Sequence, residues 1–197
     1  MTTVAARPPA PPPAAPSHTA TEPLRPKPAR TGVLVGIAAI SMSFAAFTSA
    51  LVVRQGASPD WQHFRLPTIL YLNTLLLIAS SFTLETCRRR QPPGRAWLYV
   101  TLALGLLFVL GQVLAWRNLA GQGLFLATSP SSAFFYIFTA LHGLHLLGGV
   151  AGLSYALHRL NRAPGPAGAA TLGAAALYWH FMAVLWLYLL ALLALRI

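Results

Sequence analysis

The segment Ala133–Leu153 reads AFFYIFTALHGLHLLGGVAGL and contains no aspartate, glutamate, lysine or arginine. An α-helix rises about 1.5 Å per residue, so about 20 apolar residues cross the hydrocarbon layer of a membrane. The segment therefore predicts a transmembrane helix. Its two histidines lie three residues apart. They raise the question of whether such residues bind a metal or haem, transfer protons, or only pack inside a bundle.

The composition of the whole chain is typical of a membrane protein. Of its 197 residues, 56% are hydrophobic and 9% are charged, whereas about 25% are charged in a typical soluble domain. The formal net charge of +11 does not indicate nucleic-acid binding, because the arginines lie between apolar segments rather than on one face. The single cysteine, Cys87, excludes a disulfide framework and a paired-cysteine zinc site.

Five segments in all are long and apolar enough to cross a membrane. The expected spans are Val33–Val53, Leu66–Thr86, Trp97–Trp116, Ser132–Leu157 and Ala175–Leu195. Backbone groups in lipid must be hydrogen-bonded within each segment, so the predicted fold class is an all-α bundle of five transmembrane helices. Residues 1–30 are rich in proline and alanine, and we expect a disordered cytoplasmic tail there, ahead of a membrane domain over residues 31–197.

The distribution of lysine and arginine predicts the orientation of this bundle. Ten of the 14 basic residues fall on the side of the N-terminal tail, and four fall on the other side. Loops rich in lysine and arginine remain in the cytoplasm. The expected topology is therefore N-terminus inside and C-terminus outside.

Small polar residues form a stripe in the second span. They are Asn73, Thr74, Ser80 and Ser81, related by a seven-residue spacing. Seven residues are nearly two helical turns, so the stripe is expected to face other helices and to hydrogen-bond to them. A proton or water path is the alternative interpretation.

Glu85 is the only carboxylate inside a predicted span, and it precedes Arg88 and Arg89 by three and four residues. This is the spacing of ion pairs on a helix. A salt bridge at the inner membrane rim is therefore expected, although an intramembrane carboxylate can also mark a functional site. The basic cluster Arg88–Arg90 could in addition hold anionic lipid head groups.

One face of the fourth span combines aromatic, histidine and glycine residues. Steps of four and three residues place Phe138, His142, His145, Gly149 and Gly152 on this face. The pairs Gly148–Gly152 and Thr139–Gly143 have a small-xxx-small spacing, which permits close approach of two helices. The face is therefore expected to be buried against another helix or another protein.

Metal or haem binding by the intramembrane histidines is the less favoured interpretation. His180 in the fifth span and His145 differ in expected depth by about 10 Å, and His142 lies farther still. One metal needs imidazole nitrogens at about 2 Å. His142 and His145 lie on one helix and cannot bind a haem from opposite faces. We expect neutral histidines that hydrogen-bond across helices, with no metal or cofactor bound by this chain.

The sequence contains no catalytic constellation. It has no buried carboxylate pair, no nucleophile elbow and no phosphate-binding glycine loop, and its only acidic residues are Glu22, Asp60 and Glu85. This favours an auxiliary membrane subunit over a self-sufficient enzyme.

Three segments resemble subunit III of the haem-copper oxidases, the family of cytochrome c oxidase. They are LPTILYLNTLLLIASSFTLE (66–85), SAFFYIFTALHGLHLLGGVAGL (132–153) and YWHFMAVLWLYLLALL (178–193). The resemblance extends from about Thr31 to the last residue, and the five helices look like the short bacterial form of the family. A multi-pass protein of the bacterial inner membrane is therefore expected. Members commonly have an aspartate where this chain has Ala183, which puts a proton-handling role of the last helix in doubt.

The resemblance implies a subunit without a redox centre of its own. Haem and copper are expected in partner subunits, with subunit I as the main contact, subunit II beside it, and cytochrome c as electron donor to the complex. The family role implied for this chain is to stabilise subunit I, support proton uptake and hold lipids.

The resemblance also implies which residues pack or contact subunits and lipids; they are Asn73, Ser80, Ser81, Glu85, His142, Gly143, His145, Gly148, Gly149, Trp179, His180 and Trp186. The charge and spacing patterns above add Arg88, Arg89 and Gly152 as expected contact residues. None of them is expected to be catalytic.

Several alternatives stay open at this point. The accessory membrane protein of nitric oxide reductase shares these motifs, and a quinol oxidase has a subunit III as well. From other classes, an independent b-type cytochrome or a small transporter is possible, although no span shows the broken-helix pattern of a transporter.

Overall fold

A computed structural model describes residues 28–57, 59–90, 94–162 and 165–197. The predicted disordered tail therefore lies almost wholly outside the described residues. Residues 28–30, which the prediction assigned to the tail, belong to the first helix.

Five long helices make up the described chain, and this confirms the predicted fold class. They are α1 (Pro28–Ala57), α2 (Ile69–Arg89), α3 (Arg95–Gly121), α4 (Pro130–Arg162) and α5 (Pro166–Arg196). Each is long and apolar enough to cross a membrane. No strand occurs among the described residues.

The helix ends differ from the predicted spans in a systematic way. Most helices extend beyond them, because hydropathy marks only the part in hydrocarbon while the helical backbone continues into the interface. α2 is the exception, since it begins at Ile69 rather than at Leu66. The amide of Leu70 donates to the carbonyl of Pro67 in a turn, and a proline disfavours helical geometry in the residue before it.

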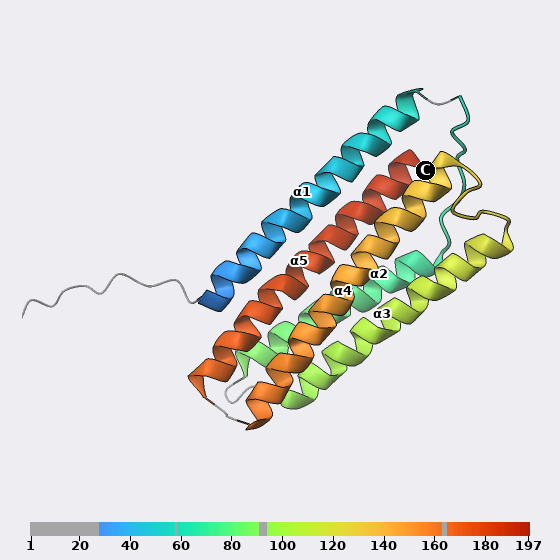
Figure 1. Ribbon diagram of the computed structural model, residues 1–197. Coiled ribbons are helices and arrows are strands. Elements are labelled where there is room, and N and C mark those ends of the chain that lie inside the picture. Colours follow the sequence, from blue (N-terminus) through green and yellow to red (C-terminus); the bar gives the residue numbers. More distant parts are fainter. Residues whose placement is uncertain (1–27, 58, 91–93, 163–164) are drawn as a thin grey trace, which may run out of the picture.

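Helices α2, α3, α4 and α5 form a closed ring of neighbours, α2 to α3, α3 to α4, α4 to α5, and α5 back to α2. α1 packs on the outside of this ring, against α4 and α5 (Figure 1). Only 11% of its most apolar segment is buried, compared with 44% for α5. The interior of the four-helix ring is therefore where side chains from several helices can meet.

The bundle has two ends that differ in charge. We call one end the arginine rim, formed by the end of α2 with Arg88 and Arg89, the start of α3 with Arg95, and the end of α4 with Arg159 and Arg162. Across the rim, Arg95 donates to the carbonyl of Leu160 at 3.2 Å.

We call the opposite end the C-terminal rim. There the connection between α1 and α2 closes over the end of α5. The indole of Trp61 donates to the carbonyl of Arg196 at 3.1 Å, and the amide of Phe64 donates to the carbonyl of Ile197 at 3.1 Å. Helix directions in Figure 1 place the start of α1 at the same end as the arginine rim.

Candidate functional site

The polar stripe of α2 points into the ring and hydrogen-bonds to two other helices. Asn73 Nδ2 donates to the carbonyl of Phe108 on α3 at 3.4 Å. Thr74 and Ser80 each accept from a tryptophan indole of α5, Trp186 and Trp179 respectively, at 3.0 Å. These are the interhelical hydrogen bonds that the seven-residue spacing predicted.

Ser81 is different from its neighbour Ser80. Its Oγ is buried but has no hydrogen-bond partner in the described part of the chain. One residue further along a helix the side chain turns by about 100°. The two hydroxyl groups therefore point in different directions, and the indole N–H of Trp179 donates to Ser80 rather than to Ser81.

The histidines of α4 do not hydrogen-bond across helices, so that expectation was wrong for both. His145 Nδ1 pairs with the carbonyl of Leu141, one turn back on its own helix, at 2.7 Å. His142 is fully buried, and neither of its nitrogens has a partner among the described residues. The rings of Phe108 and Trp186 enclose it, with centroids 5.8 Å and 5.0 Å away.

The glycines of α4 differ in how closely α5 approaches them. A Cβ on Gly149 would lie 3.2 Å from both Tyr178 and Trp179, so this glycine does allow α5 to approach. A Cβ on Gly143 or Gly152 would have no atom of the described chain within 4 Å, apart from its own helix backbone and chain neighbours. No helix of the described chain therefore packs closely on Gly143 or Gly152, and the prediction of a buried face holds there only as contact with another protein. The packing face of α4 centres on Phe138, His142 and Gly149.

Two glycines on α3 allow side chains of neighbouring helices to approach closely, a role that the sequence predicted for glycines of α4. A Cβ on Gly105 would lie 2.6 Å from the ring of Trp179, and a Cβ on Gly111 would overlap the amide of Asn73. Both lie in pairs with the small-xxx-small spacing, Thr101–Gly105 and Gly111–Ala115. The signal was therefore present in the sequence, but the prediction applied this spacing only to the fourth span.

At the arginine rim, Glu85 forms the predicted ion pairs. Its two carboxylate oxygens accept hydrogen bonds from Arg88 and Arg89, both at 2.9 Å. His180 Nε2 of α5 lies 3.8 Å from Glu85 Oε2, a contact that the sequence analysis did not predict. The sequence did contain an indication of this contact. His180 lies five residues and Glu85 one residue from the inner ends of their predicted spans, so the two are expected at similar depth.

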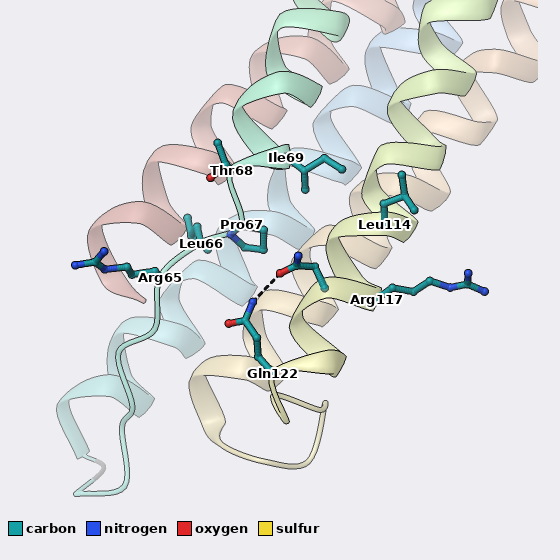
Figure 2. A pocket seen from close by; sticks show the side chains of 9 residues that line it. Arg65, Leu66, Pro67, Thr68, Ile69, Leu114, Arg117 and Gln122 are labelled. Atoms are coloured by element: carbon teal, nitrogen blue, oxygen red, sulfur yellow. Dashed lines mark hydrogen bonds between the residues drawn. The ribbon is translucent and has the colours of Figure 1, made fainter.

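A polar pocket of about 800 Å³ lies at the C-terminal rim, between the start of α2 and the end of α3. Leu66, Ile69 and Leu114 form apolar walls. The side chains of Arg65 and Arg117 extend on opposite sides of it (Figure 2). A pocket that combines apolar walls with a guanidinium group on each side has the chemistry of a lipid site, with acyl chains against the walls and an anionic head group near the arginines.

The predicted site residues thus separate by position. His142 and Trp186 meet inside the ring, with ring centroids 5.0 Å apart, and Asn73 is linked to them through Phe108. Ser80 and Gly149 both contact Trp179. Glu85, Arg88, Arg89 and His180 gather at the arginine rim, whereas His145 and Gly152 join neither group. Among the described residues, no three histidine, cysteine or acidic side chains are placed to hold a metal ion.

Comparison with known proteins identifies the family. The family model described as cytochrome c oxidase subunit III matches residues 37–195, from the first turns of α1 to the end of α5. The chain belongs to the cytochrome c oxidase subunit III family. This confirms the resemblance and the predicted function as an oxidase subunit III, a component of a complex that acts as an oxidase.

Relatives of similar length support the assignment. A probable cytochrome c oxidase subunit 3 of Mycobacterium leprae is 35% identical, over 84% of this chain and 86% of the relative. One of Mycobacterium tuberculosis is 34% identical, over 84% and 86%. The cytochrome c oxidase subunit 3 of Thermostichus vulcanus is 32% identical, over 82% and 84%. The similarity thus covers most of both chains, in keeping with a five-helix subunit III.

Proposed function

We propose that this subunit III stabilises the catalytic subunit I of a haem-copper terminal oxidase and supports proton uptake, without a redox centre of its own. Haem and copper lie in the partner subunits, and cytochrome c delivers electrons to the complex. The observation that carries this proposal is the family match across all five helices. The interior of the ring fits it, because tryptophan, phenylalanine and small polar side chains line it and no group that could bind a redox centre is placed there among the described residues.

The motif residues have two roles in this proposal. One group is buried within the chain itself and serves internal packing; it consists of Asn73, Ser80, His142, Gly149, Trp179 and Trp186. The remaining motif and rim residues are at least partly accessible to another subunit or to lipid; they are Ser81, Glu85, Arg88, Arg89, Gly143, His145, Gly148, Gly152 and His180.

The proposed location is the bacterial inner membrane, with the N-terminus and the arginine rim in the cytoplasm. Six arginines near this end of the bundle support the orientation, since they end or directly follow α2, begin α3 and lie in the last turn of α4; they are Arg88, Arg89, Arg90, Arg95, Arg159 and Arg162. The positive-inside bias assigns such an end to the cytoplasm. Cysteine accessibility at each rim, in intact cells, tests this orientation.

Purification through a tag on this chain, in mild detergent from native membranes, tests the assembly. We expect a much larger haem-containing subunit to co-purify with it. Isolation of the chain as a lone polypeptide contradicts the proposal.

We propose two anionic phospholipid contacts, one at each rim. At the arginine rim, Arg88 and Arg89 hold Glu85 but remain exposed, so they can also reach a phosphate. At the C-terminal rim, Arg65 and Arg117 flank the pocket shown in Figure 2, whose walls are partly apolar.

Native mass spectrometry of the complex measures the bound lipids. We expect the double variant Arg65→Gln/Arg117→Gln to lose bound phosphatidylglycerol or cardiolipin and to keep phosphatidylethanolamine. The single variant Arg196→Gln is the matched control, because Arg196 is exposed at the same rim but does not line the pocket. Unchanged anionic lipid in the double variant contradicts the C-terminal site.

A further inference from the structure

Three buried side chains inside the four-helix ring have polar atoms without a hydrogen-bond partner among the described residues. They are Asn73 Oδ1, both amide atoms of Gln112, and both ring nitrogens of His142. The exposed fractions of the three residues are 1%, 3% and 0%. They come from α2, α3 and α4 respectively.

The three side chains lie at one level of the bundle. Asn73 donates to the carbonyl of Phe108 and fills the space beside Gly111, the residue before Gln112. The ring of Phe108 contacts His142. Gln112 follows Phe108 by one helical turn, so it lies on the same face of α3.

The next turn of α3 fixes the position of Gln112 more closely. Trp116, one turn beyond Gln112, donates from its indole to Thr139 at 3.0 Å. Thr139 precedes His142 by about one turn on α4. Since α3 faces α4 both at Phe108 and at Trp116, the Gln112 amide between them faces the segment of α4 from Thr139 to His142.

Rotating these groups in place does not remove the unpaired atoms. Asn73 Nδ2 already donates to a carbonyl, so flipping its amide would place oxygen against oxygen. A flip of the Gln112 amide or the His142 ring exchanges two atoms that are both unpaired. Either tautomer of His142 leaves one donor and one acceptor unused.

The missing partners cannot come from outside the chain. The atoms are already buried within the chain alone, so a neighbouring subunit or a lipid does not reach them. Buried polar groups in native proteins are almost always hydrogen-bonded, to protein or to ordered water. In the hydrocarbon region, bulk water is no substitute.

We propose that Asn73, Gln112 and His142 bind ordered water inside the ring. Their unpaired atoms can hydrogen-bond to water. The side-chain oxygens of Asn73 and Gln112 accept hydrogen bonds, the Gln112 NH₂ group donates them, and a neutral imidazole has one donor and one acceptor nitrogen. A buried water typically makes two to four such bonds. All three side chains are neutral in this arrangement and no carboxylate adjoins them, so the site suits a neutral ligand better than a cation.

The site joins three helices by their side chains. On the side of α5, the rings of Phe108 and Trp186 contact each other and form an aromatic wall. The indole N–H of Trp186 donates to Thr74, so it is not available to the site. Bound water thus supplies hydrogen-bond partners to buried polar atoms that have none among the described residues.

A cryo-EM map of the complex purified through this chain, at a resolution that shows ordered water, tests the proposal. We expect density at about 2.7–3.2 Å from the Gln112 amide and from a ring nitrogen of His142. Direct hydrogen bonds among the three side chains, or no density between them, overturn it. The site lies within one chain, so the result does not depend on which partner subunits accompany the chain in the map.

Radiolytic footprinting in ¹⁸O-labelled water gives a second readout. Radicals formed from bound water should oxidise Phe108 and Trp186 several-fold faster than Phe44, a buried phenylalanine outside the site. The variant Gln112→Met, similar in length but without amide atoms, should reduce that difference. Equal labelling of Phe108 and Phe44 in the wild-type protein overturns the proposal, and this result does not depend on whether the variant folds.

Discussion

Substitution of Gly111 by alanine tests the close packing of α2 on α3. A Cβ at this position overlaps the Asn73 amide, which then has to move away from the carbonyl of Phe108. Gly152 is the matched control, because a Cβ there has open space. Both residues are helical glycines, so the gain in helix propensity is the same for both substitutions.

The expected loss follows from three contributions. Overpacking a filled interior costs about 1–3 kcal/mol, and the lost hydrogen bond costs about 1 kcal/mol. Alanine recovers about 1 kcal/mol relative to glycine in a helix. Gly111→Ala should therefore lower the free energy of unfolding by about 1–3 kcal/mol, whereas Gly152→Ala should leave it unchanged or raise it slightly.

The assay is the thermal stability of the detergent-solubilised complex, followed by fluorescence-detected size exclusion after heating. For a chain of this length the apparent unfolding temperature of Gly111→Ala should fall by roughly 2–12 °C. The Gly152→Ala variant should retain the wild-type value. Equal stability of the two variants would refute the packing of Asn73 against Gly111.

Three further predictions use the same thermal assay. Ser80→Ala leaves the buried Trp179 indole N–H unpaired and should cost about 1–3 kcal/mol, whereas Ser81→Ala, which removes an unpartnered hydroxyl, should cost nothing measurable; equal losses would contradict the hydrogen bond. Phe138→Ala empties a fully buried site and should cost about 3–5 kcal/mol; a loss below about 1 kcal/mol would show that this face of α4 is not packed. Glu85→Gln removes partly exposed ion pairs and should cost about 1 kcal/mol or less, so a larger loss would assign Glu85 a structural role beyond the rim.

The sequence predicted the fold class, the five helices and the chemistry of the arginine rim. These features depend on properties local to one helix. Hydropathy is summed along a segment, and the spacing of Glu85, Arg88 and Arg89 lies within about one turn. The helix start at Ile69 was missed because the apolar run continues through Pro67, where the backbone turns before the helix begins.

Features that depend on two helices were predicted only in part. The stripe containing Asn73 and Ser80 indicated that α2 hydrogen-bonds to other helices, but the donors, Trp179 and Trp186, could not be assigned. The histidine-glycine face of α4 was predicted to be buried against another helix or another protein, but the sequence did not indicate that α5 packs on Gly149 while Gly152 has open space. Which of several equally small or polar residues meets a neighbour depends on the rotation of each helix, and a single sequence does not specify that rotation.

Gln112 shows the same difficulty for a candidate binding group. It is one amide in an apolar segment of α3 and belongs to no spacing pattern in the sequence. Only the pairing of Phe108 with His142 and of Trp116 with Thr139 places it opposite α4.

Oxygen uptake by the fraction purified through a tag on this chain tests the central claim most directly. Supplied with reduced cytochrome c, the fraction should consume oxygen and show the absorption bands of haem in the co-purified subunit. A haem-free fraction, or one that reduces nitric oxide but not oxygen, would contradict the assignment of this chain to a cytochrome c oxidase.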